Sequence, residues 1–214
     1  MAIAQLDLRP SWRGWMHAVA FFVAIPAGVL LVLVAEPGAA RTGALVYSLS
    51  LMVGLGTSAA YHRLARTERA RAVMQRLDHS TIYILIAGTY VPLCLVALPP
   101  AWGIPLLVAV AGGALVGVIL KLTAFHRARY VSSALYPALG WAAVIAAPAL
   151  VDHLTRVQLT LVVLGGLAYT IGIPVLFSRR PDPWPRHFGN HEVWHTFTVI
   201  AAVLHFAAVS YVVT

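Results

Sequence analysis

The chain has 214 residues, of which 60% are hydrophobic and only 10% are charged, whereas a soluble domain usually has about 25% charged residues. This composition excludes a soluble globular domain and indicates an integral membrane protein. The formal net charge of +8 does not indicate nucleic-acid binding, because the basic residues are few and are not interleaved with aromatic residues. The single cysteine, Cys94, excludes an internal disulfide framework and gives no sign of a thiolate metal site.

Seven apolar segments are long enough to cross a bilayer, since about 20 helical residues span the roughly 30 Å of hydrocarbon. The first is too long for the apolar core of a secretory signal, so we expect it to remain as a span. The connectors are short and rich in Pro and Gly, which leaves no room for a second domain. The sequence therefore predicts an all-α fold, a single seven-transmembrane helical bundle over residues 1–214, with spans at about 15–35, 43–64, 77–98, 103–123, 130–150, 157–177 and 190–213.

The basic residues predict the orientation of these spans. Thirteen of the fifteen Lys and Arg residues lie at the N-terminus or in the second, fourth and sixth loops, and only Arg41 and Arg156 lie on the other side. Because basic residues near span ends stay in the cytoplasm, we expect a cytoplasmic N-terminus and an extracytoplasmic C-terminus in the inner (plasma) membrane of a cell. The excess of Arg over Lys favours a bacterial source. The thirteen are Arg9, Arg13, Arg63, Arg66, Arg69, Arg71, Arg76, Lys121, Arg127, Arg129, Arg179, Arg180 and Arg186.

Ionisable residues gather at the predicted cytoplasmic ends of three spans. Such residues cost several kcal/mol inside a membrane and usually serve a function. With the predicted orientation, these three groups share one depth in the bilayer although they are distant in the sequence. They are Ser58 and His62 at the end of the second span, Asp78 and His79 at the start of the third, and His191, Glu192 and His195 at the start of the seventh.

The spacing within these groups favours a metal site. Residues four apart lie on one face of a helix, so His191 and His195 can direct their rings at one point, and Ser58 lies one turn from His62. Three imidazoles with an open fourth position are typical of catalytic zinc. Asp78 is then available to orient or deprotonate a zinc-bound water, whose pKa falls to about 7. The reaction type that this arrangement predicts is hydrolysis.

Each residue also has a simpler interpretation. The two histidines of the seventh span can cap carbonyls or lie among lipid headgroups, Asp78 can be the N-cap of the third span, and Ser58 can bond to the carbonyl one turn back. These interpretations do not explain why the three groups share one depth. The remaining histidines lack a partner at metal spacing, and we interpret them as interfacial or structural: His17, His126, His153, His187 and His205.

The motifs at these positions resemble those of a known family, the bacterial haemolysin III branch of the progestin and adipoQ receptor family. The resemblance covers essentially the whole chain. That family is similar to the alkaline ceramidases, whose shared Ser, Asp and three His imply metal-dependent hydrolysis of lipid amides. The motifs are Ser58-x3-His62, Asp78-His79-Ser80 followed by Ile86-Ala87-Gly88-Thr89-Tyr90-Val91-Pro92, and His191-Glu192-x2-His195.

The resemblance implies a Zn²⁺ ion on His62, His191 and His195, with Asp78 and Ser58 holding the metal-bound water. It also implies a ceramide-like substrate, a membrane lipid that we expect to enter between the helices. No residue of these motifs indicates a pore, so the sequence gives no support to a lytic activity.

Three other functions stay open at this point. The pattern His191-Glu192-x2-His195 matches HExxH, in which the Glu is the general base of a metalloprotease. Against a protease, Glu192 is set about 100° from the face of the histidines, and no acidic residue follows it in the sequence. A receptor or sensor with structural zinc requires the same three histidines. A channel is disfavoured, because mainly small hydroxyl residues extend from Ser58 across the midplane.

Overall fold

The computed structural model describes residues 10–214, and Arg9, one of the basic residues counted above, lies outside the described residues. The described chain is all-α. Its elements in chain order are α1 (Trp15–Val34), α2 (Ala39–Leu64), α3 (Glu68–Pro92), the π-helix η1 (Leu93–Ala97), α4 (Pro100–Thr123), α5 (Arg129–Gly140), the 3-10 helix η2 (Ala142–Ala146), α6 (Ala147–His153), α7 (Arg156–Ser178) and α8 (Asn190–Val213).

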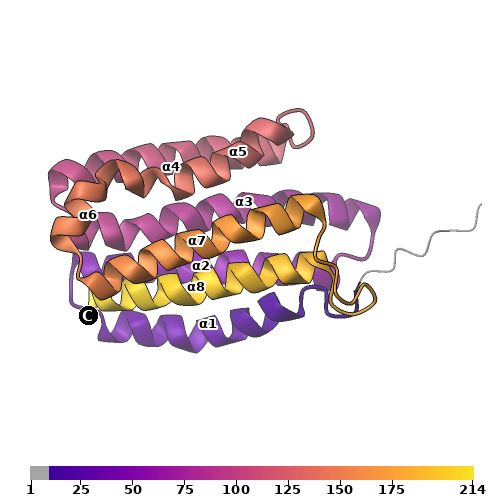
Figure 1. Ribbon diagram of the computed structural model, residues 1–214, viewed down its shortest axis with the longest axis horizontal. Coiled ribbons are helices and arrows are strands. Elements are labelled where there is room, and N and C mark those ends of the chain that lie inside the picture. The colour runs from indigo at the N-terminus through magenta and orange to yellow at the C-terminus, as the bar shows by residue number, and fades with distance from the viewer. Residues whose placement is uncertain (1–9) are drawn as a thin grey trace, which may run out of the picture.

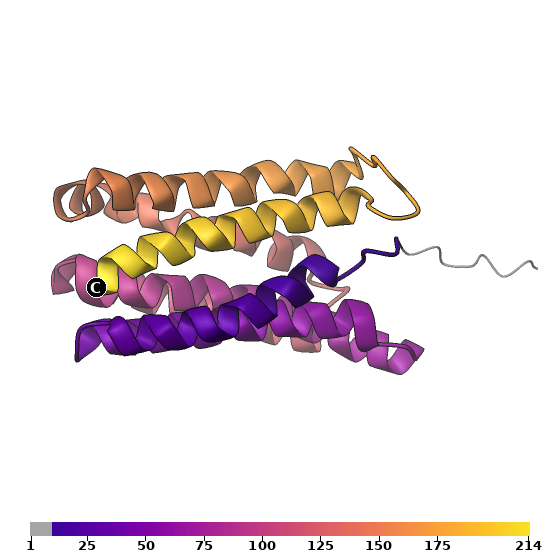
Figure 2. The ribbon, with the colours of Figure 1, turned by 90° about the horizontal axis from the view of Figure 1, so that it is seen from below.

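Among residues 10–214, seven helical units are long and apolar enough to cross a membrane, which confirms the predicted seven-helix bundle. Figures 1 and 2 show the units side by side with roughly parallel axes. The start of α1 and the loops α2–α3, α4–α5 and α7–α8 lie at one end, which we call the N-terminal end of the bundle, and the C-terminus lies at the other. The charge pattern predicts that the N-terminal end faces the cytoplasm.

Two helical units differ from their predicted form. Helix α3 begins at Glu68, well before the expected residue 77, and Thr67 caps it by accepting a hydrogen bond from the backbone N–H of Ala70 at 3.1 Å. The arginine-rich stretch before the third span is therefore mostly helix, since Arg and Ala favour helix wherever no breaker intervenes. The fifth unit consists of α5, η2 and α6: α5 ends at Gly140, and Pro148 lies in the first turn of α6, where its missing N–H is tolerated.

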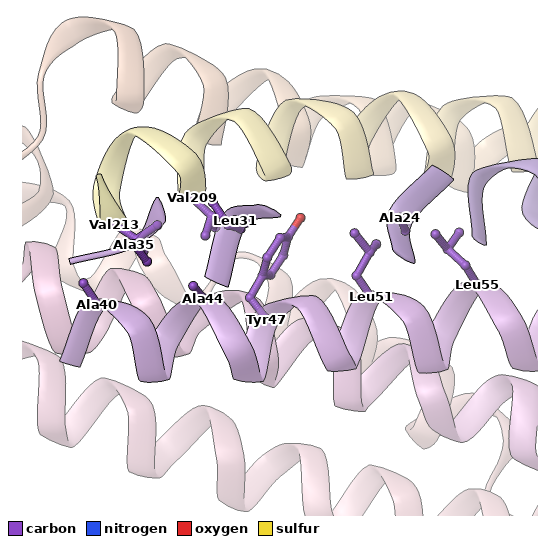
Figure 3. Packing of buried hydrophobic residues seen from close by; sticks show 10 residues of the cluster. All are labelled: Ala24, Leu31, Ala35, Ala40, Ala44, Tyr47, Leu51, Leu55, Val209 and Val213. Carbon is purple, nitrogen blue, oxygen red and sulfur yellow. The ribbon is translucent and has the colours of Figure 1, made fainter. Parts of the chain in front are cut away.

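A buried cluster joins α1 and α2 along much of their length and includes the last two turns of α8 (Figure 3). Tyr47 on α2 lies at its centre and is almost fully buried. Helix α8 also packs against α3 and α7, so it occupies the middle of the bundle. In lipid such contacts stabilise through close packing, because lipid tails are as apolar as the side chains themselves. The cluster fixes α2 and α8 relative to each other. Its members are Ala24, Leu31, Ala35, Ala40, Ala44, Tyr47, Leu51, Leu55, Val209 and Val213.

The segment before α1 is attached to the loop that precedes α8. The backbone N–H groups of Ser11 and Trp12 donate to the carbonyl oxygens of Arg186 and His187, at 3.0 and 3.1 Å. The Trp12 ring also makes an edge-to-face contact with Phe188, with ring centroids 6.1 Å apart. These contacts hold the first turn of α1 beside the first turn of α8.

Candidate metal centre

Three histidines from two helices meet at the N-terminal end of the bundle. His62 lies in the last turn of α2, and His191 and His195 lie in the first two turns of α8. Their candidate ligand nitrogens all lie within 4.8 Å of one another, and the Nε2 atoms of His62 and His191 are 3.2 Å apart. His195 is only 4% exposed, and the other two are half-buried. The predicted metal-ligating residues are thus brought together, in what we call the histidine triad.

The geometry of the histidine triad fits a divalent metal ion. Zn–N bonds of 2.0–2.1 Å in a tetrahedron put neighbouring ligand nitrogens about 3.3 Å apart, and the separation of His62 Nε2 from His191 Nε2 is 3.2 Å. The three rings are inclined to one another by 51–73°, with centroids 4.4–5.1 Å apart, so they are not stacked in parallel. The triad can therefore bind a metal, although imidazole ligands by themselves suit zinc, copper, iron and nickel alike.

Asp78 and Ser58 lie together between α2 and α3. Asp78 is inside α3, well past its first residue Glu68, which makes the N-cap interpretation wrong. Ser58 is buried on α2 one turn before His62. Its hydroxyl donates a hydrogen bond to the Asp78 carboxylate. A carboxylate and the hydroxyl that orients it are thus joined one helical turn from a triad histidine.

His79, whose function the sequence left open, lies near Asp78, with its Nδ1 atom 3.8 Å from Asp78 Oδ2, but its hydrogen bonds and ring contact are to other residues. Its Nδ1 donates to the carbonyl oxygen of Gln75 at 2.8 Å, and its ring makes an edge-to-face contact with Phe125. The Tyr136 hydroxyl donates to the backbone oxygen of His79 at 2.8 Å. His79 therefore joins α3 to the α4–α5 region.

Glu192 lies between the two histidines of α8 in sequence but is bound elsewhere. It is 0% exposed. One carboxylate oxygen lies 2.5 Å from Nε of Arg13, and the other accepts the backbone N–H of Gly189 at 2.9 Å. Since both oxygens are occupied by these partners, the general-base function of an HExxH protease has no support in the geometry. Glu192 instead caps α8 and forms a buried ion pair.

His17 is the residue that sequence reasoning missed. We interpreted it as interfacial or structural, but it is 8% exposed and its ring stacks on that of His195, with centroids 3.9 Å apart and planes 2° apart. It has no partner at metal spacing on its own helix, so a search for spaced histidines cannot find it. The available signal was its position in the first turn of the first span, at the same end as the triad.

Comparisons with known proteins agree with this architecture. The model of the family described as "Haemolysin-III related" matches residues 8–206. The chain is 30% identical to the Hemolysin-3 homolog of Bacillus subtilis (strain 168) over 186 residues, which cover 86% of this chain and 84% of the relative. It is 28% identical to Hemolysin-3 of Bacillus cereus over 200 residues, covering 92% of this chain and 88% of the relative.

A plant protein is similar over much of its length as well. The chain is 30% identical to the heptahelical transmembrane protein ADIPOR2 of Oryza sativa subsp. japonica over 190 residues, which cover 80% of this chain and 82% of that protein. This match, like those to the bacterial relatives, extends over most of the chain. The chain is therefore a multi-pass membrane protein of bacterial type that belongs to the haemolysin III branch of the progestin and adipoQ receptor family.

Proposed function

We propose that this protein is a zinc-dependent hydrolase that cleaves the amide bond of a membrane lipid. The observation that carries the proposal is the convergence of the ligand nitrogens of His62, His191 and His195 within 4.8 Å. A set of three imidazoles leaves the fourth position of a zinc ion to water or substrate, as in catalytic zinc sites, whereas structural zinc sites usually have four protein ligands. The Ser58–Asp78 pair beside His62 supplies the acid–base group that hydrolysis requires.

In the proposed reaction, water adds to the amide carbonyl carbon, the C–N bond breaks, and a fatty acid and an amine are released. His62, His191 and His195 would hold the zinc ion, whose Lewis acidity would make water nucleophilic at neutral pH. The Asp78 carboxylate would accept the proton of the attacking water and return it to the leaving nitrogen. The Ser58 hydroxyl holds the carboxylate in place, because its hydrogen bond leaves Asp78 with fewer orientations.

A lipid substrate is supported by the position of the triad. All three histidines lie on helices that are long and apolar enough to cross the membrane, at the ends of those helices. A molecule that is already in the bilayer can reach this depth by moving laterally between helices. The resemblance to the alkaline ceramidases adds the expectation of an amide bond. The first substrate to test is therefore a ceramide, an N-acylated long-chain amino alcohol.

A receptor or sensor that uses the same zinc structurally is the second candidate. It requires the histidine triad but no acid–base group, so replacing Asp78 by Ala separates the two functions. We expect Asp78→Ala to keep one zinc per chain and to lower ceramide hydrolysis by about 10²–10⁴-fold, the usual contribution of a general acid–base group. Asp152→Ala is the matched control, because Asp152 is exposed on α6, near the other end of the bundle.

The assay measures zinc by elemental analysis and released fatty acid by mass spectrometry, on protein in detergent and in lipid vesicles. Ceramide hydrolysis by Asp78→Ala at the rate of the unmodified chain would show that this carboxylate is not part of the mechanism. Zinc in the unmodified protein without any hydrolysis of ceramide would favour the sensor.

A further inference from the structure

His17 is held against His195 by two kinds of contact. The first is the parallel stacking of the two rings at 3.9 Å. The second passes through Thr198, whose hydroxyl lies 3.0 Å from His17 Nε2 and donates to the backbone oxygen of His195 at 2.8 Å. Since the Thr198 proton is used on that carbonyl, His17 Nε2–H must be the donor to Thr198. His17 therefore contacts the ring of His195 directly and is connected to its backbone through Thr198.

The remaining nitrogen of His17 argues against a purely stabilising function. Its Nδ1 atom is buried and has no hydrogen-bond partner among residues 10–214. An unsatisfied buried polar atom is unfavourable for folding, and an apolar ring of similar size would avoid that penalty. Packing alone therefore does not explain why an imidazole occupies position 17. Its stacking contact and its hydrogen bond to Thr198 both connect it to His195.

The residues just before α1 also contact α2, the other helix that carries a triad histidine. Gly14 has a positive φ of 80°, and a Cβ atom there would lie 2.6 Å from Cβ of His62. Arg13 next to it forms the buried ion pair with Glu192, between the two histidines of α8. The start of α1 thus contacts α2 at His62 and α8 at Glu192 and His195, and it holds the ends of both helices together.

We propose that His17 is a positioning residue for the metal centre: its stacked ring holds the imidazole of His195 in the orientation that metal binding requires. The inference rests on the metal-binding part of the proposed function and goes beyond it, because it assigns a function to a histidine that is not itself a ligand. A neighbouring ring that already holds a ligand histidine in place reduces the conformational entropy that this histidine loses when the ion binds. Loss of a neighbour that orients a ligand typically weakens metal affinity by about 10–100-fold.

The test compares three variants by zinc affinity, measured by chelator competition on the purified full chain. His17→Ala removes ring and hydrogen bond, and we expect about tenfold weaker zinc binding. His17→Phe keeps a flat ring but loses the hydrogen bond to Thr198, and its loss of affinity should be clearly smaller than that of His17→Ala, because stacking on His195 remains. His205→Ala is the matched control, since His205 is also a histidine of α8 and is half-buried, but it bonds to the Val162 carbonyl, and its affinity should be unchanged.

A spectroscopic readout separates positioning from general destabilisation. With Co²⁺ in place of zinc, the visible absorption bands report the ligand geometry, and His17→Ala should shift them while His205→Ala leaves them as they are. Should His17→Ala fail to yield folded protein, Thr198→Val removes the bridge to the His195 carbonyl at nearly constant shape, and we expect a measurable loss of affinity.

Zinc affinity of His17→Ala within twofold of the unmodified chain would overturn the inference, as would equal losses in His17→Ala and His17→Phe. An unmodified chain that binds no zinc would overturn both this inference and the proposed function. Zinc binding without hydrolysis would contradict the hydrolase proposal alone, because the affinity measurement involves no substrate.

Discussion

The ion pair between Arg13 and Glu192 allows a direct test of how much the contact between the segment before α1 and the first turn of α8 stabilises the protein. Replacing Arg13 by Ala removes the cation and leaves the buried carboxylate of Glu192 without its charged partner. Replacing Glu192 by Gln removes the charge and keeps a side chain that can still accept the Gly189 N–H. The double variant has neither charge.

The structure sets the size of the effect. Breaking a buried ion pair by removing one partner costs about 3–5 kcal/mol. The Arg13 side chain is 22% exposed, and Gly189 still donates to Glu192, so the lower end of that range applies. We expect Arg13→Ala to lose about 3 kcal/mol, which is roughly 6–12 °C in Tm for a chain of this size. In the double variant, replacing Glu192 by Gln should restore about half of that loss, because no unpaired charge remains.

Thermal unfolding in detergent, followed by circular dichroism with zinc absent, measures these differences. A Tm of Arg13→Ala within about 1 °C of the unmodified chain would refute the reasoning. So would a double variant less stable than Arg13→Ala, because an unpaired carboxylate would then not be the source of the loss. Glu192→Gln should also keep its ceramide hydrolysis, whereas an HExxH protease mechanism requires the carboxylate for activity.

Further predictions concern close approaches of the backbone. A Cβ atom on Gly103 would lie 2.1 Å from the Cys94 carbonyl oxygen, so Gly103→Ala should lower the Tm by several degrees. Gly112 on the same helix is the control, because no atom lies within 4 Å of an added Cβ. Gly112→Ala should therefore leave the Tm unchanged or slightly higher. Gly14→Ala should weaken zinc binding as well as stability, because its methyl group meets Cβ of His62 at 2.6 Å. Tm and chelator competition measure these effects, and an unchanged zinc affinity in Gly14→Ala would contradict the second.

Gly38→Ala is the control for Gly14→Ala. Gly38 also has a positive φ, of 90°, but nothing lies within 4 Å of an added Cβ. Both variants carry backbone strain. Only Gly14→Ala should change the zinc affinity.

Much of the fold and of the candidate site followed from the sequence because membrane physics leaves few alternatives. The length of each apolar segment predicted the seven spans, and helical spacing placed His191 and His195 on one face. The convergence of His62 on this pair needed only the assumption that polar groups at one depth share a site. The 100° offset of Glu192 likewise indicated that it points away from the histidines, and its bonds to Arg13 and Gly189 agree.

Other features depend on contacts between distant segments, which spacing does not reveal. The stacking of His17 on His195 arises because residues 11 and 12 bond to the loop before α8. The early start of α3 was missed because hydropathy finds the part of a helix inside the bilayer, whereas this helix continues past it. The start of α6 in the fifth unit had a visible signal in Pro148, which lies in the first turn of that helix.

The measurement that tests the central claim most directly is the zinc content of purified protein with His62, His191 or His195 each replaced by Ala. The account predicts about one zinc per unmodified chain and a large loss in each of the three variants, because every one removes a ligand from the same ion. His153→Ala, on the exposed end of α6, should keep its zinc. Full zinc content in any of the three triad variants would contradict a shared metal ion.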